Sequence, residues 1–318
     1  MLVRGSNLNQ KHFVYPKDWG QGSRGCWSGG GSSNTTNTNN THFVTISTPG
    51  NSTLFGSVTT NLKKAGGASG QGRGLICGGS TNTTSLNTIL YVTIATPAAA
   101  TSFGNMVIAR VQPQATSNGT RAIIIGGSIS YNAGNTLASI DYIAIATLGN
   151  ASNFGNTIDG QVQDNSAATG DGTYGMVICD PGNWNSSKYH YVAIDTPGNT
   201  SIFGGITNLK GEGMAANSNG SRAIWSGGYD GGVVNYIDYL TWATASNAIQ
   251  LGALRVNIVY GSGCEDGSRA IHGAGASSKI EYFSMDVTPS NAVISANFGT
   301  MGVDGSGTRH YPAAYAGD

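Results

Sequence analysis

Short apolar runs alternate with glycine-rich and polar segments along the whole chain. The run Arg121–Gly127 carries three consecutive isoleucines and ends in two glycines, as expected of a buried strand that leads into a sharp turn. In the segment Ile140–Thr147, aromatic and small residues alternate with Ile143 and Ile145, so the two kinds of side chain fall on opposite faces of a strand. Both patterns predict short β-strands separated by tight turns.

Three markers recur along the sequence with one period of about 48 residues. The first is a glycine-containing turn that ends in Arg24, Arg73, Arg121, Arg222 and Arg269, with Tyr174 in the same place once. The second is an aromatic residue at Phe43, Tyr91, Tyr142, Tyr191, Tyr239 and Tyr282. The third is a Phe-Gly pair that starts at Phe55, Phe103, Phe154, Phe203 and Phe298, with Leu251-Gly252 as the one substitute. Independent markers with one period predict six structural repeats.

The order of the markers predicts four strands in each repeat. An Asn-Gly or Asp-Gly pair, such as Asn118-Gly119, precedes the first marker in several repeats and favours the positive φ angles of a tight hairpin. A strand is therefore expected on each side of this turn, a third strand carries the aromatic marker, and a fourth begins at Phe-Gly. A lone four-stranded sheet has two faces to cover and two open edges, so it persists by stacking on copies of itself.

Radial stacking of the six sheets gives an all-β fold, a six-bladed β-propeller with four-stranded blades over residues 1–301. The repeats start near Arg24, Arg73, Arg121, Tyr174, Arg222 and Arg269. A β-solenoid or a sandwich is the alternative, but the rungs of a solenoid are shorter than this repeat. We expect Lys11–Trp19 to supply the first strand of blade one, because they precede Arg24 as Leu62–Gly70 precede Arg73. Residues 302–318 are then a C-terminal tail or a closing strand.

The repeat resembles the kelch repeat. Two glycines close the second strand, as at Gly126-Gly127, an acidic residue precedes the marker aromatic, as at Asp141-Tyr142, and a large aromatic opens the fourth strand. The resemblance implies a kelch-like propeller. The sequence departs from the pattern at Asp180-Pro181 and Gly273–Gly275, which replace the glycine pair in two blades, and these blades are expected to be locally distorted.

The amino-acid sequence of the repeats also resembles kelch-like repeats in virion proteins of tailed phages of aquatic bacteria. The segments that carry this likeness are Ser117–Arg121 and Ile140–Thr147, followed by Gly149–Ala151 and Phe154-Gly155. The resemblance implies a part of the extracellular virion, in a tail fibre, a baseplate or the capsid surface. It supplies no binding residue.

Charge and composition exclude several classes of partner. Basic and acidic residues balance at 16 each, and no basic run exceeds Lys63-Lys64, so neither nucleic acid nor anionic lipid is an expected partner. No apolar run approaches the ~18 residues of a membrane helix, and Met1–Gly20 shows no signal peptide. The four cysteines, Cys26, Cys77, Cys179 and Cys264, lack metal-ligand spacing and are expected to be small packing or loop residues in preference to disulfide partners.

Candidate chemistry is sparse, and we expect no catalytic residue, metal site or cofactor. His42 and His190 share a repeat position with Asp141, Asp238 and Glu281, but this third strand lies about 9–10 Å outside the innermost strand, too far for one ion to be shared. The position should instead face solvent or the next blade. Gly20–Gly25 matches GxGxxG only because the turn is glycine-rich. The repeated arginine is expected to cap or stack on a neighbouring strand, with ligand binding as the alternative.

The loops between the second and third strands are the most variable part of the repeat. They are Gly31–Thr41, Ser80–Thr88, Ser128–Ser139, Pro181–Lys188, Tyr229–Asn235 and Ala276–Ser278. All six should emerge on one face of a propeller, where recognition residues are commonly placed on a rigid scaffold. Tyr131, Trp184 and Tyr229 are the candidate ligand-binding residues, because aromatic rings beside Asn and Ser suit glycans or proteins.

These observations predict a non-enzymatic structural protein of a phage virion that serves as a rigid recognition or assembly platform. Its expected partners are other virion proteins, host-surface glycan, or both, and copies of the chain could assemble into a homo-oligomer. The alternatives are a kelch-like carbohydrate-active enzyme of the oxidase or epimerase type, and a cell-surface lectin or filament subunit.

Overall fold

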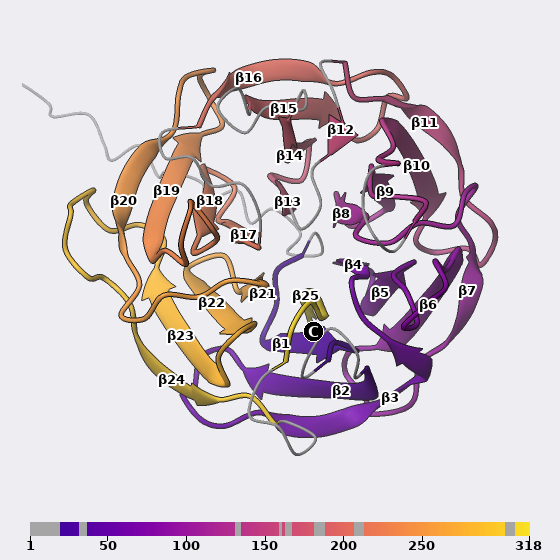
Figure 1. Cartoon of the computed structure of the whole chain (residues 1–318), viewed down its shortest axis with the longest axis horizontal. Coiled ribbons are helices and arrows are strands. Elements are labelled where there is room, and N and C mark those ends of the chain that lie inside the picture. The colour runs from indigo at the N-terminus through magenta and orange to yellow at the C-terminus, as the bar shows by residue number, and fades with distance from the viewer. Residues whose placement is uncertain are drawn as a thin grey trace, which may run out of the picture.

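Six antiparallel sheets stand around a central axis and form a β-propeller (Figure 1). The computed structural model describes residues 20–31, 37–130, 135–158, 161–162, 167–180, 188–206, 213–302 and 309–318. Strands and their turns make up all of these ranges, without a helix. The predicted fold class, all-β with six four-stranded blades, is confirmed.

Each blade is a sheet whose strands follow one another from the axis outwards. Blade one contains β25 (Ala313–Gly317), β1 (Arg24–Ser28), β2 (Thr38–Thr45) and β3 (Thr53–Leu62). Blade two contains β4 (Gly66–Gly70), β5 (Arg73–Cys77), β6 (Thr88–Thr93) and β7 (Thr101–Asn105). Blade three contains β8 (Gln114–Ser117), β9 (Arg121–Ile125), β10 (Ser139–Ala144) and β11 (Ser152–Asn156).

The other three blades follow the same order. Blade four contains the two short inner strands β12 (Gln161–Val162) and β13 (Ala168–Gly170), then β14 (Tyr174–Asp180), β15 (Lys188–Ala193) and β16 (Ser201–Gly205). Blade five contains β17 (Ala215–Ser218), β18 (Arg222–Ser226), β19 (Tyr236–Thr241) and β20 (Ile249–Ala253). Blade six contains β21 (Gly261–Glu265), β22 (Arg269–Ala274), β23 (Lys279–Ser284) and β24 (Ala296–Thr300).

Of the two blades that depart from the glycine pair and were expected to be distorted, blade six keeps the backbone path and blade four differs locally. In blade three Gly126 and Gly127 have φ angles of 60° and 91°, and in blade six Ala274 and Gly275 take the same place with φ angles of 66° and 89°. The backbone path is thus kept although one residue there is an alanine. In blade four the innermost strand is divided between β12 and β13, both of which pair with β14.

The C-terminal strand closes the ring, which corrects the prediction made for Lys11–Trp19. β25 pairs antiparallel with β1, from Arg24 opposite Gly317 to Ser28 opposite Ala313. This is the inner edge that Lys11–Trp19 were expected to occupy, and those residues lie outside the described ranges. Residues 313–317 therefore act as a closing strand. Blade one joins the two ends of the chain, so strands from both termini share one set of backbone hydrogen bonds.

Small residues let the innermost strands converge on the axis. β4 reads GGASG and β25 reads AAYAG, and a Cβ atom added to Gly67 would overlap the carbonyl oxygen of Ala314 in the neighbouring blade. Tyr315 is the large exception in β25, and its ring covers Gly74 of blade two, where a side chain would overlap it. The hydroxyl of Tyr315 hydrogen-bonds to Ser28 Oγ at 2.8 Å. This one side chain therefore connects the closing strand to two blades.

Each arginine marker joins its blade to the next one. The guanidinium carbon of Arg73 lies 5.0 Å from the centre of the Tyr91 ring in its own blade. Its Nη1 donates to the carbonyl oxygens of Ile145 at 2.5 Å and Ala146 at 3.0 Å in the next blade. We call this arrangement the arginine latch, and it recurs at Arg24, Arg121, Arg222 and Arg269. The expectation that the arginine caps or stacks on a neighbouring strand is confirmed.

The Phe-Gly marker lies at the same interfaces. A Cβ atom at Gly104 would overlap the carbonyl oxygen of Gly149, in the turn between the third and fourth strands of the next blade. The side chain of Asn150, the residue after it, accepts a hydrogen bond from the backbone N–H of Asn105 at 3.0 Å. Equivalent acceptors at the other interfaces are Asn51, Asn199 and Asn247. The markers are therefore the contacts by which one blade recognises the next.

The polar position before the aromatic marker is buried and faces a neighbouring blade. Asp141 is 1% exposed, and its Oδ2 accepts hydrogen bonds from the Val107 N–H and from Arg110 Nη2, both at 3.0 Å. Glu281 Oε2 accepts the backbone N–H of Arg255 in the same way, at 2.9 Å. Solvent is thus excluded for these residues, and the neighbour that they contact is the preceding blade where the next blade was predicted. Each carboxylate binds the segment that leaves the preceding blade.

All four cysteines are buried and free, as expected of small packing residues. Burial raises the pKa of the Cys26 thiol to about 12 and that of Cys77 to about 12. Both thiols are therefore protonated at neutral pH.

The closing strand predicts a large stability effect for one tyrosine. Tyr315→Ala should lower the free energy of unfolding by about 3–5 kcal/mol, because it removes a buried ring that fills the space over Gly74. The matched control is Tyr229→Ala, whose ring is 37% exposed and whose loss should change stability by about 0.5 kcal/mol or less. Denaturant titration of both variants measures the difference. Equal midpoints for the two variants would show that β25 does not close the ring.

Candidate recognition face

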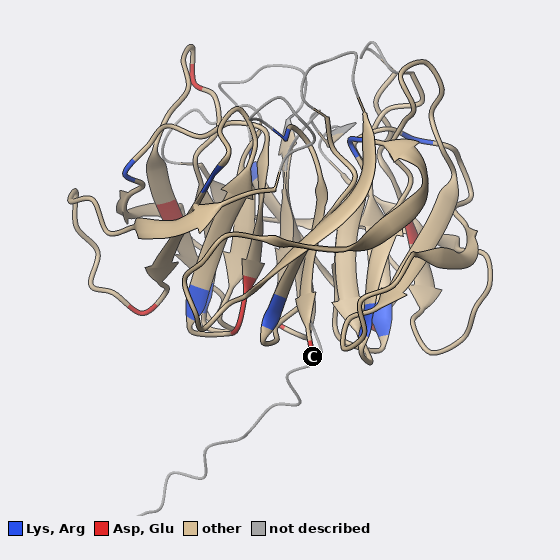
Figure 2. Cartoon of the chain, turned by 90° about the horizontal axis from the view of Figure 1, so that it is seen from below, with Lys and Arg blue, Asp and Glu red and all other residues tan. Residues whose placement is uncertain are grey.

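The two ends of the propeller carry different connections. The first-to-second and third-to-fourth strand turns share one end with the C-terminus, where the Ser23 N–H donates to Asp318 Oδ1 at 2.7 Å, and we call this end the turn face. The loops between the second and third strands lie at the opposite end, the loop face, together with the connections that lead to the next blade. Figure 2 shows the ring from the side with the C-terminus at its lower end.

Neighbouring loops on the loop face contact one another. The side-chain amide of Asn37 in blade one donates to the Ser80 carbonyl oxygen in blade two at 3.3 Å. Ser85 Oγ in blade two donates to the Ile129 carbonyl oxygen in blade three at 2.9 Å. Hydrogen bonds therefore join the described parts of the loops of blades one to three.

Only one of the three candidate ligand-binding residues can be placed. Tyr229 is 37% exposed and begins the loop of blade five, where it forms a bridge with Val233. Tyr131 and Trp184 lie outside the described residues. The structure thus places Tyr229 on the loop face.

An uncharged polar groove lies between blades one and two on this face. It has a volume of about 580 Å³ and is lined by Asn37, Asn39, Thr59, Thr60, Asn61, Thr81 and Asn82. Residues 37 and 39 precede or belong to β2, residues 59–61 extend β3 beyond the usual length of a fourth strand, and residues 81–82 belong to the next loop. The described lining offers only amide and hydroxyl groups. Such a lining donates and accepts hydrogen bonds without favouring either charge.

A ring of left-handed residues surrounds the mouth of the central channel at the same end. Each of these residues lies one or two positions before the innermost strand of its blade, which pairs with the second strand. They are Lys64, Gln112, Gly213, Tyr260 and Tyr311, and their φ angles lie between 57° and 75°. Their backbones form a chain of hydrogen bonds from blade to blade: Gln112 N–H to Lys64, Lys64 N–H to Tyr311, Tyr311 N–H to Tyr260, and Tyr260 N–H to Gly213. We call these five residues the collar.

The collar holds large side chains at a conformational cost. Glycine takes this backbone conformation freely, as Gly213 does, whereas other residues lose about 1 kcal/mol or more there. The Tyr260 and Tyr311 rings lie 4.5 Å apart, and Lys64 Nζ lies 5.1 Å from the centre of the Tyr311 ring. These contacts give the side chains a structural role in the mouth of the channel.

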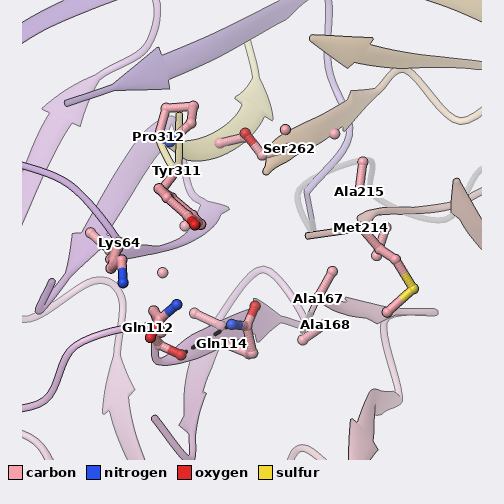
Figure 3. A pocket seen from close by; sticks show the side chains of 18 of the residues that line it. Lys64, Gln112, Gln114, Ala167, Ala168, Met214, Ala215, Ser262, Tyr311 and Pro312 are labelled. Carbon is pink, nitrogen blue, oxygen red and sulfur yellow. Dashed lines mark hydrogen bonds between the residues drawn. The ribbon is translucent and has the colours of Figure 1, made fainter. Parts of the chain in front are cut away.

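A cavity of about 100 Å³ lies inside the collar. Figure 3 shows Lys64, Gln112, Gln114 and Tyr311 around it, with the small residues Ala167, Ala168 and Ala215 on the other side. The amide of Gln114 is fixed by a hydrogen bond from Nε2 to the Gln112 carbonyl oxygen at 3.1 Å. Small residues of the inner strands also line the cavity, and a second cavity of about 50 Å³ follows it along the axis towards Glu265.

Sequence reasoning missed both the groove and the collar. The groove residues are Asn and Thr, which the pattern explains equally well as turn residues. The collar residues share a backbone conformation and a position in the repeat but no residue type. An alignment of the six repeats at the residues before each inner strand would have brought them together.

A buried carboxyl group lies at the other end of the channel. Glu265 ends β21, and its Oε2 accepts a hydrogen bond from Asn217 Nδ2 at 2.7 Å while its Oε1 accepts one from the Ser218 N–H at 3.3 Å. The backbone of Gln21 pairs with that of Glu265 through a parallel β-bridge. Burial raises the pKa of Glu265 to about 8, against the opposing effect of the hydrogen bonds from Asn217 and Ser218. The side chain is therefore largely protonated at neutral pH.

The described residues hold neither a metal-binding cluster nor a membrane-spanning helix. Within them, no three His, Cys, Asp or Glu side chains gather closely enough to hold a metal ion. The same residues contain no helix of the length and hydropathy needed to cross a membrane.

The sequence matches no model of a known protein family and no curated protein. The assignment of the fold as a β-propeller therefore comes from the structure.

The raised pKa of Glu265 predicts that stability falls as the pH rises. An acid whose folded pKa of about 8 exceeds its ordinary value of 4.5 binds a proton more tightly in the folded state. Its contribution is complete below pH 4.5 and is lost between pH 4.5 and 8, at up to about 1.4 kcal/mol per pH unit. Denaturant titrations at several pH values should show this loss for the wild type and a flatter profile for Glu265→Gln. Identical pH profiles for the two proteins would contradict the assignment.

Proposed function

We propose that this propeller is a recognition and assembly platform of a phage virion, and that it binds glycan of the host surface through the loop face. The observation that carries the proposal is the uncharged groove between blades one and two, whose described lining consists of Asn and Thr alone. Polysaccharides present dense hydroxyl groups, and side-chain amides and hydroxyls can both donate to them and accept from them.

The architecture supports the proposal because the strands keep the same contacts in most blades while the loops vary. The markers of the repeat are used in contacts between blades, so the strands are constrained in every repeat. The loops and the loop-face ends of β2 and β3 lie outside these marker contacts and differ between blades. A rigid scaffold that presents variable loops reduces the entropy lost when a ligand binds.

The virion assignment rests on the resemblance of the repeats to those of phage virion proteins. Pairing of β25 with β1 leaves no unpaired strand edge where the ring closes. This suits an extracellular particle, because unpaired strand edges promote aggregation. Contacts with other virion proteins would use surfaces of the ring outside the groove.

Binding should be sensitive to the groove. The double variant Thr60→Ala/Asn61→Ala removes an exposed hydroxyl and an exposed amide from the lining and should weaken binding to an array of bacterial surface polysaccharides at least fivefold. Its melting temperature should stay close to that of the wild type, because exposed side chains contribute little to stability. Tyr229→Ala tests the other described candidate on this face in the same assay.

Two controls use the opposite end of the ring. Thr147→Ala removes an exposed threonine from the turn face and should leave array binding unchanged. Arg121→Ala breaks an arginine latch and should lower the free energy of unfolding by about 1–3 kcal/mol without weakening binding. If the groove variant binds like the wild type while Arg121→Ala does not, the recognition surface lies on the turn face and the proposal is wrong.

A further inference from the structure

One of the six blade interfaces breaks the pattern of the other five. Blade four carries Tyr174 where the other blades carry the latch arginine, so among the described residues no arginine donates to the carbonyl groups at the start of the corresponding turn in blade five, those of Trp242 and Ala243. Trp242 also differs from its equivalents. Five blades have an isoleucine or methionine there, fully buried, at Ile46, Ile94, Ile145, Ile194 and Met285, whereas Trp242 is partly exposed.

Aromatic rings replace the latch at this interface. Tyr174 stands edge-on to Tyr191 with ring centres 5.5 Å apart, Tyr191 lies 5.5 Å from Phe203, and Phe203 lies 6.4 Å from Trp242 in the next blade. The four rings form a row across the interface. Its two ends are accessible, since Tyr174 is 38% exposed and Trp242 is partly exposed.

The row is held in place from below. The indole Nε1 of Trp242 donates to Ser218 Oγ at 3.2 Å, which fixes the ring over the first turn of blade five. Phe203 is 8% exposed and anchors the middle of the row in the core between the blades. Trp242 is thus preorganised, and a ligand that stacks on it does not have to order this ring first.

We propose that this row is a second binding site, on the turn face, and that it takes a neutral saccharide. A sugar ring has an apolar face of C–H groups that packs on aromatic rings, and its hydroxyl groups can donate to the Trp242 and Ala243 carbonyl oxygens, whose equivalents accept arginine N–H groups at the other interfaces. A guanidinium from a partner protein is a poorer fit, because the Tyr174 ring already occupies the latch position over Tyr191.

The site can be tested by restoring the pattern of the other blades. Tyr174→Arg/Trp242→Ile gives this interface the residues that hold the other five, so it should fold with a melting temperature no lower than that of the wild type. The probes are maltohexaose, cellohexaose and chitohexaose, with saturation-transfer difference NMR as the readout. At least one of these sugars should receive saturation from the wild type, and its dissociation constant should be at least tenfold higher for the double variant.

Further variants keep the test decisive. Tyr174→Phe retains the ring and should bind within about threefold of the wild type, and Tyr174→Arg alone repeats the test if the double variant does not fold. The groove variant Thr60→Ala/Asn61→Ala should bind these hexasaccharides unchanged, which separates this site from the loop face. Absence of transfer to all three sugars in the wild type, or equal binding by the restored variants, would overturn the inference.

Discussion

The ring depends on an arginine that stacks on an aromatic side chain of its own blade and donates to carbonyl groups of the next. In blade two, Arg73 covers Tyr91 and reaches the Ile145 and Ala146 carbonyl oxygens. Backbone carbonyls at the end of a strand lack partners within their own sheet, so this contact satisfies them and fixes the angle between blades at once. Its repetition at five interfaces explains why the sequence keeps an arginine and an aromatic residue in phase.

The loops of the loop face can vary in sequence and length because most contacts between blades are made elsewhere. Contacts between blades use the turns at one end, the Phe-Gly pairs and the buried carboxylates such as Asp141. Loops at the other end take part in few of them, which leaves the loop-face ends of β2 and β3 able to lengthen and line a polar groove. The interface between blades four and five shows that the turn face can also vary, but there the change replaces the latch itself with a row of aromatic rings.

The fold and the faces could be predicted from the sequence, because the markers are structural contacts and must recur. The closing strand could not. Its five residues, Ala313–Gly317, are mostly small, so they give no apolar pattern that separates an inner strand from a tail, and the period fits a first strand from either terminus. The collar escaped prediction for a related reason. Lys64, Gln112 and Tyr260 share a left-handed backbone and blade-to-blade hydrogen bonds, and neither property selects one residue type. Of the candidate site residues, Tyr229 is placed on the loop face and the groove went unforeseen.

Latches and the closing strand together should make the six blades one cooperative ring. Hydrogen–deuterium exchange of the intact protein under native conditions tests this cooperativity, because amides in a cooperative unit exchange through the same opening. We expect the amides of β25 (Ala313–Gly317) to exchange as slowly as those of β4 and β8, although they lie at the end of the chain. Exchange of the β25 amides within seconds, while β4 and β8 stay protected, would contradict a ring closed in this way.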